Sequence, residues 1–200
     1  MSEDLYAPPV ARVVDQQEGA AREFYVVAPR KFLFLYMLTF GYYSIYWFYQ
    51  NWTLYKRRHA ASLWPVPRSI FQIFFVHQLF DNIDAACRRA GQRYVWNAGT
   101  QATAYVILVI VTRLADRFID RVVDTVPVPL MALALVATFL PILPLLAAQR
   151  ALNLAEGDPE GRSNAAFSAA NFAWMIAGGL FWIVVLLGLT MLVLNPDVAA

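Results

Sequence analysis

Four long segments of the chain contain no Asp, Glu, Lys or Arg, and this pattern dominates the sequence. They cover residues 32–55, 94–112, 126–149 and 163–196. An α-helix that crosses a bilayer needs roughly 20 mainly apolar residues, and all four segments approach or exceed that length. The pattern therefore predicts an all-α integral membrane bundle of about four transmembrane helices. We place these spans at about residues 32–55, 97–114, 130–149 and 170–194.

Between the first two spans, apolar residues recur at helical spacing opposite a polar face. Phe74, Leu79 and Ile83 belong to the apolar face, whereas His77 and Asp81 belong to the polar one. This pattern predicts an amphipathic helix over about residues 69–90. Polar residues interrupt it too often for a span, so we expect it to lie in the membrane interface.

The first predicted span is rich in aromatic residues, which crowd its second half after Gly41. Because Tyr and Trp prefer the membrane–water interface, two interpretations follow. One tilted helix crosses the bilayer with a broad aromatic belt, or the chain breaks near Gly41 and its second half lies along the interface. We expect the span, since a break leaves too few residues to cross.

Prolines and small residues shape the last two spans. Pro141 and Pro144 predict a kink in the second half of the third span. In the fourth, Ala173 and Ala177 with Gly178 form part of a ridge of small residues. Such a ridge lets another helix approach closely.

Composition agrees with a membrane location. Of the 200 residues, 60% are hydrophobic and only 15% are charged, against about 25% charged in soluble domains. Residues 1–23 have no apolar signal region and predict a polar, mobile tail that precedes a single membrane domain over residues 24–200. The net charge of +2 is too small to predict a nucleic-acid partner. With four spans, the basic residues favour a cytoplasmic first loop by a thin margin.

One candidate polar cluster lies on the amphipathic helix. His77, Asp81 and Asp84 stand at i, i+4 and i+7 on its polar face, a spacing that brings an imidazole and two carboxylates towards one metal ion. The alternative is that an interfacial helix needs polar residues on its outer face. No second group of ligands supplies the rest of a coordination shell, so we predict no metal and no cofactor.

A second candidate site is the polar loop before the last span. Asn153, Asp158, Asn164 and Asn171 flank this loop and are placed to close over a lipid head group or a small solute. The other interpretation is that they cap helix ends, with Asn164 accepting from the first amides of the final helix.

The aromatic run also carries a resemblance. Residues 39–49 read Thr-Phe-Gly-Tyr-Tyr-Ser-Ile-Tyr-Trp-Phe-Tyr, which resembles the T-x-G-x-Y-x-x-Y-W-x-Y signature of an uncharacterised family of small bacterial multi-pass inner-membrane proteins. Similar stretches are 24–32, 64–68 and the loop 149–164. The resemblance implies a bacterial cytoplasmic membrane, and it transfers no catalytic residue.

For function, the sequence favours a class rather than a mechanism. It shows no nucleophile, metal-protease or phosphate-loop motif, so we favour a non-enzymatic accessory protein that packs against membrane lipids, a membrane-protein partner or further copies of itself. One alternative is a small-solute or lipid transporter that acts as an oligomer, with Gln101 and the loop 157–164 near its path. Another is a lipid-modifying enzyme that uses His77, Asp81 and Asp84.

Overall fold

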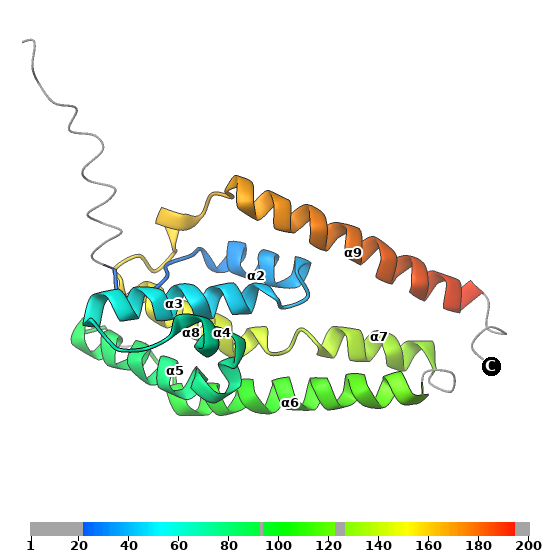
Figure 1. Ribbon diagram of the computed structural model, residues 1–200, viewed down its shortest axis with the longest axis horizontal. Coiled ribbons are helices and arrows are strands. Elements are labelled where there is room, and N and C mark those ends of the chain that lie inside the picture. Colours follow the sequence, from blue (N-terminus) through cyan, green and yellow to red (C-terminus); the bar gives the residue numbers. More distant parts are fainter. Residues whose placement is uncertain (1–21, 93, 123–126, 195–200) are drawn as a thin grey trace, which may run out of the picture.

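The computed structural model describes residues 22–92, 94–122 and 127–194 and is built from α-helices, with no strand in these ranges. The helices follow one another along the chain in the order given next, joined by short loops and one turn of 3-10 helix, η3 (Figure 1). They are α2 (Pro29–Leu38), α3 (Tyr43–His59), α4 (Pro65–Ile70), α5 (Gln72–Arg89), α6 (Ala98–Val122), α7 (Val128–Ala137), α8 (Ile142–Ala155), η3 (Arg162–Asn164) and α9 (Ala169–Leu194). The all-α fold class is confirmed.

Three segments of the described chain are long and apolar enough to cross a membrane, namely Ala98–Phe118, Pro129–Ala155 and Ala169–Met191. They correspond to the second, third and fourth predicted spans. The third predicted span is interrupted between α7 and α8, where Pro141 precedes the first residue of α8. The kink expected from its prolines is therefore present.

The first predicted span, 32–55, is not one continuous helix, and this expectation was wrong. The chain turns between α2 and α3, where Phe40 and Gly41 adopt left-handed φ values of 52° and 82°. The Thr39 hydroxyl joins the two helices, because it donates to the carbonyl of Leu35 at 2.7 Å and accepts from the amide of Tyr43 at 3.0 Å. The result is a helical hairpin. The break near Gly41, which was the alternative interpretation, is therefore present, whereas the place of the second half along the membrane interface stays a prediction.

The amphipathic helix is confirmed as α5, which begins after the short helix α4. Its apolar residues Val76, Leu79, Phe80 and Ile83 are buried, and α5 packs against α6 and α8. Most of the apolar face thus packs against helices of the same chain, which accounts for much of the amphipathic pattern, although Phe74 on the same face is 72% exposed. The place of this helix in the membrane interface stays a prediction.

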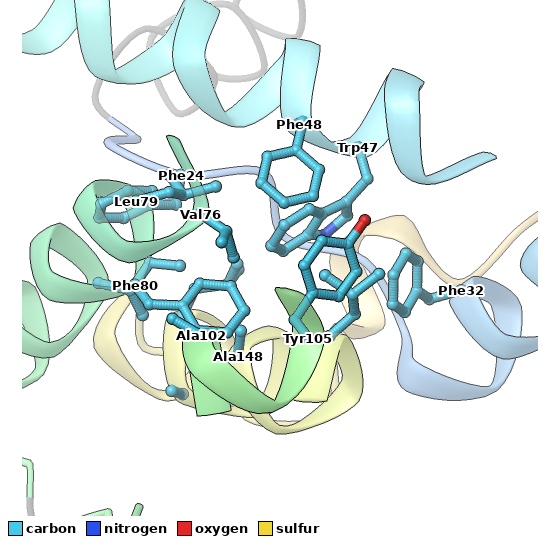
Figure 2. Packing of buried hydrophobic residues seen from close by; sticks show 14 of the residues in the cluster. Phe24, Phe32, Trp47, Phe48, Val76, Leu79, Phe80, Ala102, Tyr105 and Ala148 are labelled. Carbon is cyan, nitrogen blue, oxygen red and sulfur yellow. The ribbon is translucent and has the colours of Figure 1, made fainter. Parts of the chain in front are cut away.

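The hydrophobic core lies where α3, α5, α6 and α8 meet the extended segment before α2. Figure 2 shows Phe24 close to Leu79, and Phe32 and Tyr105 on the side of Trp47. Trp47 and Phe32 have ring centroids 5.7 Å apart, and Phe48 and Tyr105 are 5.9 Å apart. Much of the aromatic run is therefore core, which removes those rings from the membrane interface.

Helix α9 lies outside this core. It runs along α2 and α7 (Figure 1), and no residue of its apolar window is buried. Its closest approach is to the end of α2, where a Cβ added to Gly178 would lie 2.2 Å from the Leu38 carbonyl oxygen. The predicted close approach at the small-residue ridge is confirmed at Gly178.

Candidate functional site

The most extensive polar network in the described chain surrounds the extended segment 22–28. Asn153 contacts this segment as a neighbouring β-strand would: it accepts from the amide of Val27 at 3.4 Å and donates to the carbonyl of the same residue at 2.9 Å. Asn153 is fully buried. A buried amide that satisfies both backbone groups of one residue fixes that residue's position.

Asn51 and Gln149 continue the network inward from Asn153. Asn51 accepts from the amide of Tyr25 at 3.0 Å, and its amide group donates to the carbonyl of Trp47 at 2.9 Å. Gln149 donates to Asn153 at 2.7 Å and accepts from the Trp47 indole. Every polar atom of these three amides faces a protein partner, so this network stabilises the fold and has no free group for a ligand.

The loop after α8 holds the outer part of the same segment. Glu156 accepts from the amides of Glu23 and Phe24, both at 3.0 Å, and Asn164 donates to the carbonyl of Val26 at 2.9 Å. Burial raises the pKa of the Glu156 carboxyl. Glu23, the last residue of the predicted tail, also pairs with His59 and Arg89; residues 1–21 of that tail lie outside the described chain.

The four residues of the predicted loop site do not converge on one site. Asn153 and Asn164 meet at the segment 22–28. Asp158 instead closes its own turn, where it accepts from the amide of Arg162 at 2.9 Å and from the Ser163 hydroxyl at 2.7 Å. Burial opposes its ionisation, but the hydrogen bonds from Ser163 and Arg162 outweigh burial and lower the pKa of Asp158.

Asn171 caps the last helix, a role that the sequence analysis had offered for Asn164. The Asn171 side chain accepts from the amide of Ser168 at 3.0 Å, and the Ser168 hydroxyl accepts from the amide of Asn171 at 3.3 Å. This reciprocal pair has the geometry of a capping box. The Asn164 oxygen instead accepts from Lys31 Nζ at 2.7 Å.

His77, Asp81 and Asp84 are not brought together around one centre. His77 contacts the Thr103 hydroxyl at 3.1 Å, whereas Asp84 pairs with Arg88 and accepts from the Trp96 indole. Within the described ranges, no group of three or more His, Cys, Asp or Glu side chains is placed to hold a metal ion. In the described ranges, these three side chains therefore do not form a three-residue metal centre.

An aromatic groove lies between α9 and the α2–α3 hairpin, and no pattern in the sequence predicts it. The groove has a volume of about 150 Å³. Its lining residues are Thr39, Tyr42, Tyr43, Tyr46, Ser168, Ala170, Asn171 and Trp174. We call it the tyrosine groove. The Tyr43 hydroxyl is buried beside Tyr25 and has no hydrogen-bond partner of good geometry in the described chain.

A second opening continues from the tyrosine groove along α9. It is lined in part by Phe40, Ala177 and Phe181 and shares Thr39, Tyr42 and Trp174 with the tyrosine groove. Hydroxyl and amide groups thus lie near the start of α9, and apolar side chains lie further along it. The tyrosine cluster itself is visible in the sequence, but its partner wall is more than 120 residues away, as the pairing of Met37 with Trp182 illustrates at a separation of 145.

No protein-family model, curated protein or solved structure matches this chain.

Proposed function

We propose that this chain is a non-enzymatic accessory protein of the bacterial cytoplasmic membrane that holds a membrane lipid in the tyrosine groove. The observation that carries the proposal is the buried Tyr43 hydroxyl at the edge of an aromatic groove, which has beside it the Tyr25 hydroxyl but no well-aligned hydrogen bond in the described chain. A buried hydroxyl that is left wholly unsatisfied costs about 1–3 kcal/mol, so a bound polar group that aligns better than Tyr25 removes part of such a cost.

The groove is polar at one end and apolar at the other, as a lipid molecule is. Ser168 and Asn171 lie at the start of α9, and Phe181 lies more than two helical turns further along the same helix. A lipid with its ester or hydroxyl groups near Asn171 and its acyl chain towards Phe181 fits this gradient. Because α9 is apolar and unburied in its window, lipid surrounds the same helix on its other sides.

For the topology, we infer three membrane crossings, by α6, by α7 with α8, and by α9. The α2–α3 hairpin takes the place of a fourth span and enters and leaves on the same side, because its turn at Gly41 returns the chain towards its starting end (Figure 1). Arg113, Arg117 and Arg121 are the three basic residues near the far end of α6, which leaves on the opposite side 11 of the 14 basic residues in the described ranges. This imbalance favours a cytoplasmic location for the loops at residues 56–97 and 156–168.

The test is to fill the groove with a larger side chain and to measure the lipid that stays bound to the purified protein. Ala170 lines the groove, whereas Ala173, on the same helix, does not. We expect the A170F protein, purified gently from its native membrane, to lose the bound lipid seen by native mass spectrometry, and the matched A173F protein to keep it. The Y43F protein should retain less lipid than Y49F, since Tyr49 lies outside the groove.

Other results would contradict the proposal in distinct ways. A wild-type protein that carries no lipid, or an A170F protein that carries as much as wild type, excludes the groove as a lipid site. A partner at fixed ratio without lipid supports the accessory role but moves the contact elsewhere. Substrate flux in proteoliposomes favours the oligomeric transporter instead, and lipid turnover that depends on His77, Asp81 and Asp84 favours an enzyme.

A further inference from the structure

A second cavity lies at the start of α2, and an uncompensated cation forms part of its wall. Lys31 is only 5% exposed. Its Nζ donates to the Asn164 oxygen and to the carbonyl oxygen of Ala166, each at 2.7 Å, and lies 5.9 Å from the centre of the Phe167 ring. All these partners are neutral, and no carboxylate of the described chain pairs with Lys31. Burial lowers the pKa of the Lys31 amine.

The buried ammonium has bonding capacity left. An ammonium group carries three donors, and two of them are used by Asn164 and Ala166. A buried charge that meets only neutral groups is costly, and an anion nearby removes much of that cost. The side chain of Lys31 is therefore placed for a negatively charged ligand.

The cavity beside Lys31 has a volume of about 390 Å³. Its lining residues are Ala28, Arg30, Lys31, Phe34, Ala165 and Phe167. Arg30 is exposed and adds a second cation, while Phe34 and Phe167 form an aromatic wall with ring centroids 5.8 Å apart. Helix α2 begins here with no side-chain cap, so the amide groups of its first turn add to the positive potential.

We propose that this cavity binds the phosphate group of an anionic phospholipid, with Arg30 and Lys31 on the phosphate and Phe34 and Phe167 beside the glycerol and first acyl carbons. Arginine matches phosphate oxygens with two parallel donors, and lysine binds them as a point charge. The aromatic wall favours an amphiphile over a soluble anion. This inference rests on the proposed membrane insertion, which places the start of α2 at the head groups, but it concerns a site separate from the tyrosine groove.

The experiment compares nanodiscs of pure phosphatidylcholine with nanodiscs that contain equal amounts of phosphatidylcholine and phosphatidylglycerol. We expect the wild-type protein to unfold at a higher temperature in the second and to retain phosphatidylglycerol selectively when it is released for native mass spectrometry. In the K31Q protein, the preference for phosphatidylglycerol over phosphatidylcholine should fall about tenfold, which is the effect of losing one charge-assisted hydrogen bond. The R30Q protein, whose native side chain is exposed, provides a second variant in case K31Q does not fold.

The matched control is K56Q, which removes one positive charge from the exposed end of α3, outside the cavity. It should keep the wild-type preference. Equal affinity of wild type for both lipids, or an unchanged preference in both R30Q and K31Q, overturns the site. If inorganic phosphate alone stabilises the protein in pure phosphatidylcholine as much as phosphatidylglycerol does, the assignment to a lipid is overturned. If the tyrosine groove holds no lipid, A170F retains as much lipid as wild type whatever the lipid preference of K31Q. The failure of one proposal is therefore distinguishable from the failure of the other.

Discussion

Side-chain amides take the place of a β-strand at the amino-terminal segment of this protein. Asn153 binds both backbone groups of Val27, and Asn51 binds the amide of Tyr25. The segment is thereby satisfied without forming a sheet. A buried carboxylate, Glu156, completes the arrangement at the head of the segment, and it is the member of the network that responds to pH.

The burial of Glu156 predicts a specific pH dependence of stability. Its pKa in the folded protein lies above the ordinary value of 4.5, so folding favours the protonated form. The stabilisation is complete below pH 4.5 and is lost as the pH rises through the raised pKa. When the pH is lowered from 7 to 4, we expect the melting temperature of the wild-type protein to rise by about 2–4 °C relative to that of E156Q. A stabilisation of roughly 1 kcal/mol shifts the melting temperature by this amount in a protein of this length.

The measurement is thermal unfolding in detergent, followed by circular dichroism at both pH values. Glu160 lies in the same loop and is exposed, so E160Q serves as the control and should follow wild type. If the melting temperatures of wild type and E156Q differ by the same amount at both pH values, the Glu156 carboxyl does not cause this pH dependence.

At the scale of elements, the close crossing of α9 and α2 depends on one glycine. A Cβ at position 178 would lie 2.2 Å from a backbone oxygen of α2, whereas a Cβ at Gly179 would meet nothing within 4 Å. The two positions are neighbours in one helix, so they share its propensity and its surroundings in the membrane. Their difference isolates the contact.

We therefore predict that G178A destabilises the protein by about 1–3 kcal/mol, the usual cost of overpacking. The matched G179A protein should be neutral or slightly more stable, because alanine favours helix over glycine. Thermal unfolding of both variants in the same detergent measures the difference. Equal melting temperatures would show that α9 is not seated on α2 at this point.

The elements also show what local sequence patterns can and cannot predict. Three spans and the amphipathic helix followed from hydrophobic periodicity, since each is set by its own residues. The turn at Gly41 followed only as an alternative, because its support is distant: the Trp182 indole donates to the carbonyl of Met37 at 3.2 Å, and its ring centroid lies 4.4 Å from that of Phe40. Hydropathy also cannot tell a ring in lipid from one in a protein core, as Trp47 shows.

The same limit applied to the candidate site. Asn153 and Asn164 were recognised as polar residues beside apolar segments, and they do meet in space. Asn51, Gln149 and Glu156 complete their network but belong to other elements, so no spacing links them. The tyrosine groove needs α9 as its second wall, and the sequence contains no sign of which helix α9 lies beside.

For the whole molecule, the proposed three-crossing topology places Arg22 and the loop after α3 on the same side of the membrane. Four full crossings would place them on opposite sides. The two topologies are separated by labelling single cysteines in intact cells with a membrane-impermeant maleimide. Cys87 can stay in place, because it is buried and burial raises the pKa of its thiol to about 11.

We expect R22C and S62C to be protected in intact cells and P127C, at the far end of the molecule, to be labelled. After the cells are opened, all three should react, which controls for access. Labelling of R22C in intact cells together with protection of S62C would restore the four-span topology. Labelling of both with protection of P127C would keep the hairpin and reverse the orientation.

The hydrogen bonds at segment 22–28 also set an order of events during synthesis. Val27 and Asn153 are 126 residues apart, and Val26 and Asn164 are 138 apart. After synthesis, this segment therefore finds Asn51 early but waits for Asn153 and Asn164 until more than 120 further residues have been made. During that interval its backbone groups must be satisfied by water or by an insertion factor. The segment is fully bonded only when the loop after α8 has emerged, so a ribosome that stalls before residue 153 leaves the backbone groups of Val26 and Val27 without their partners in the folded protein.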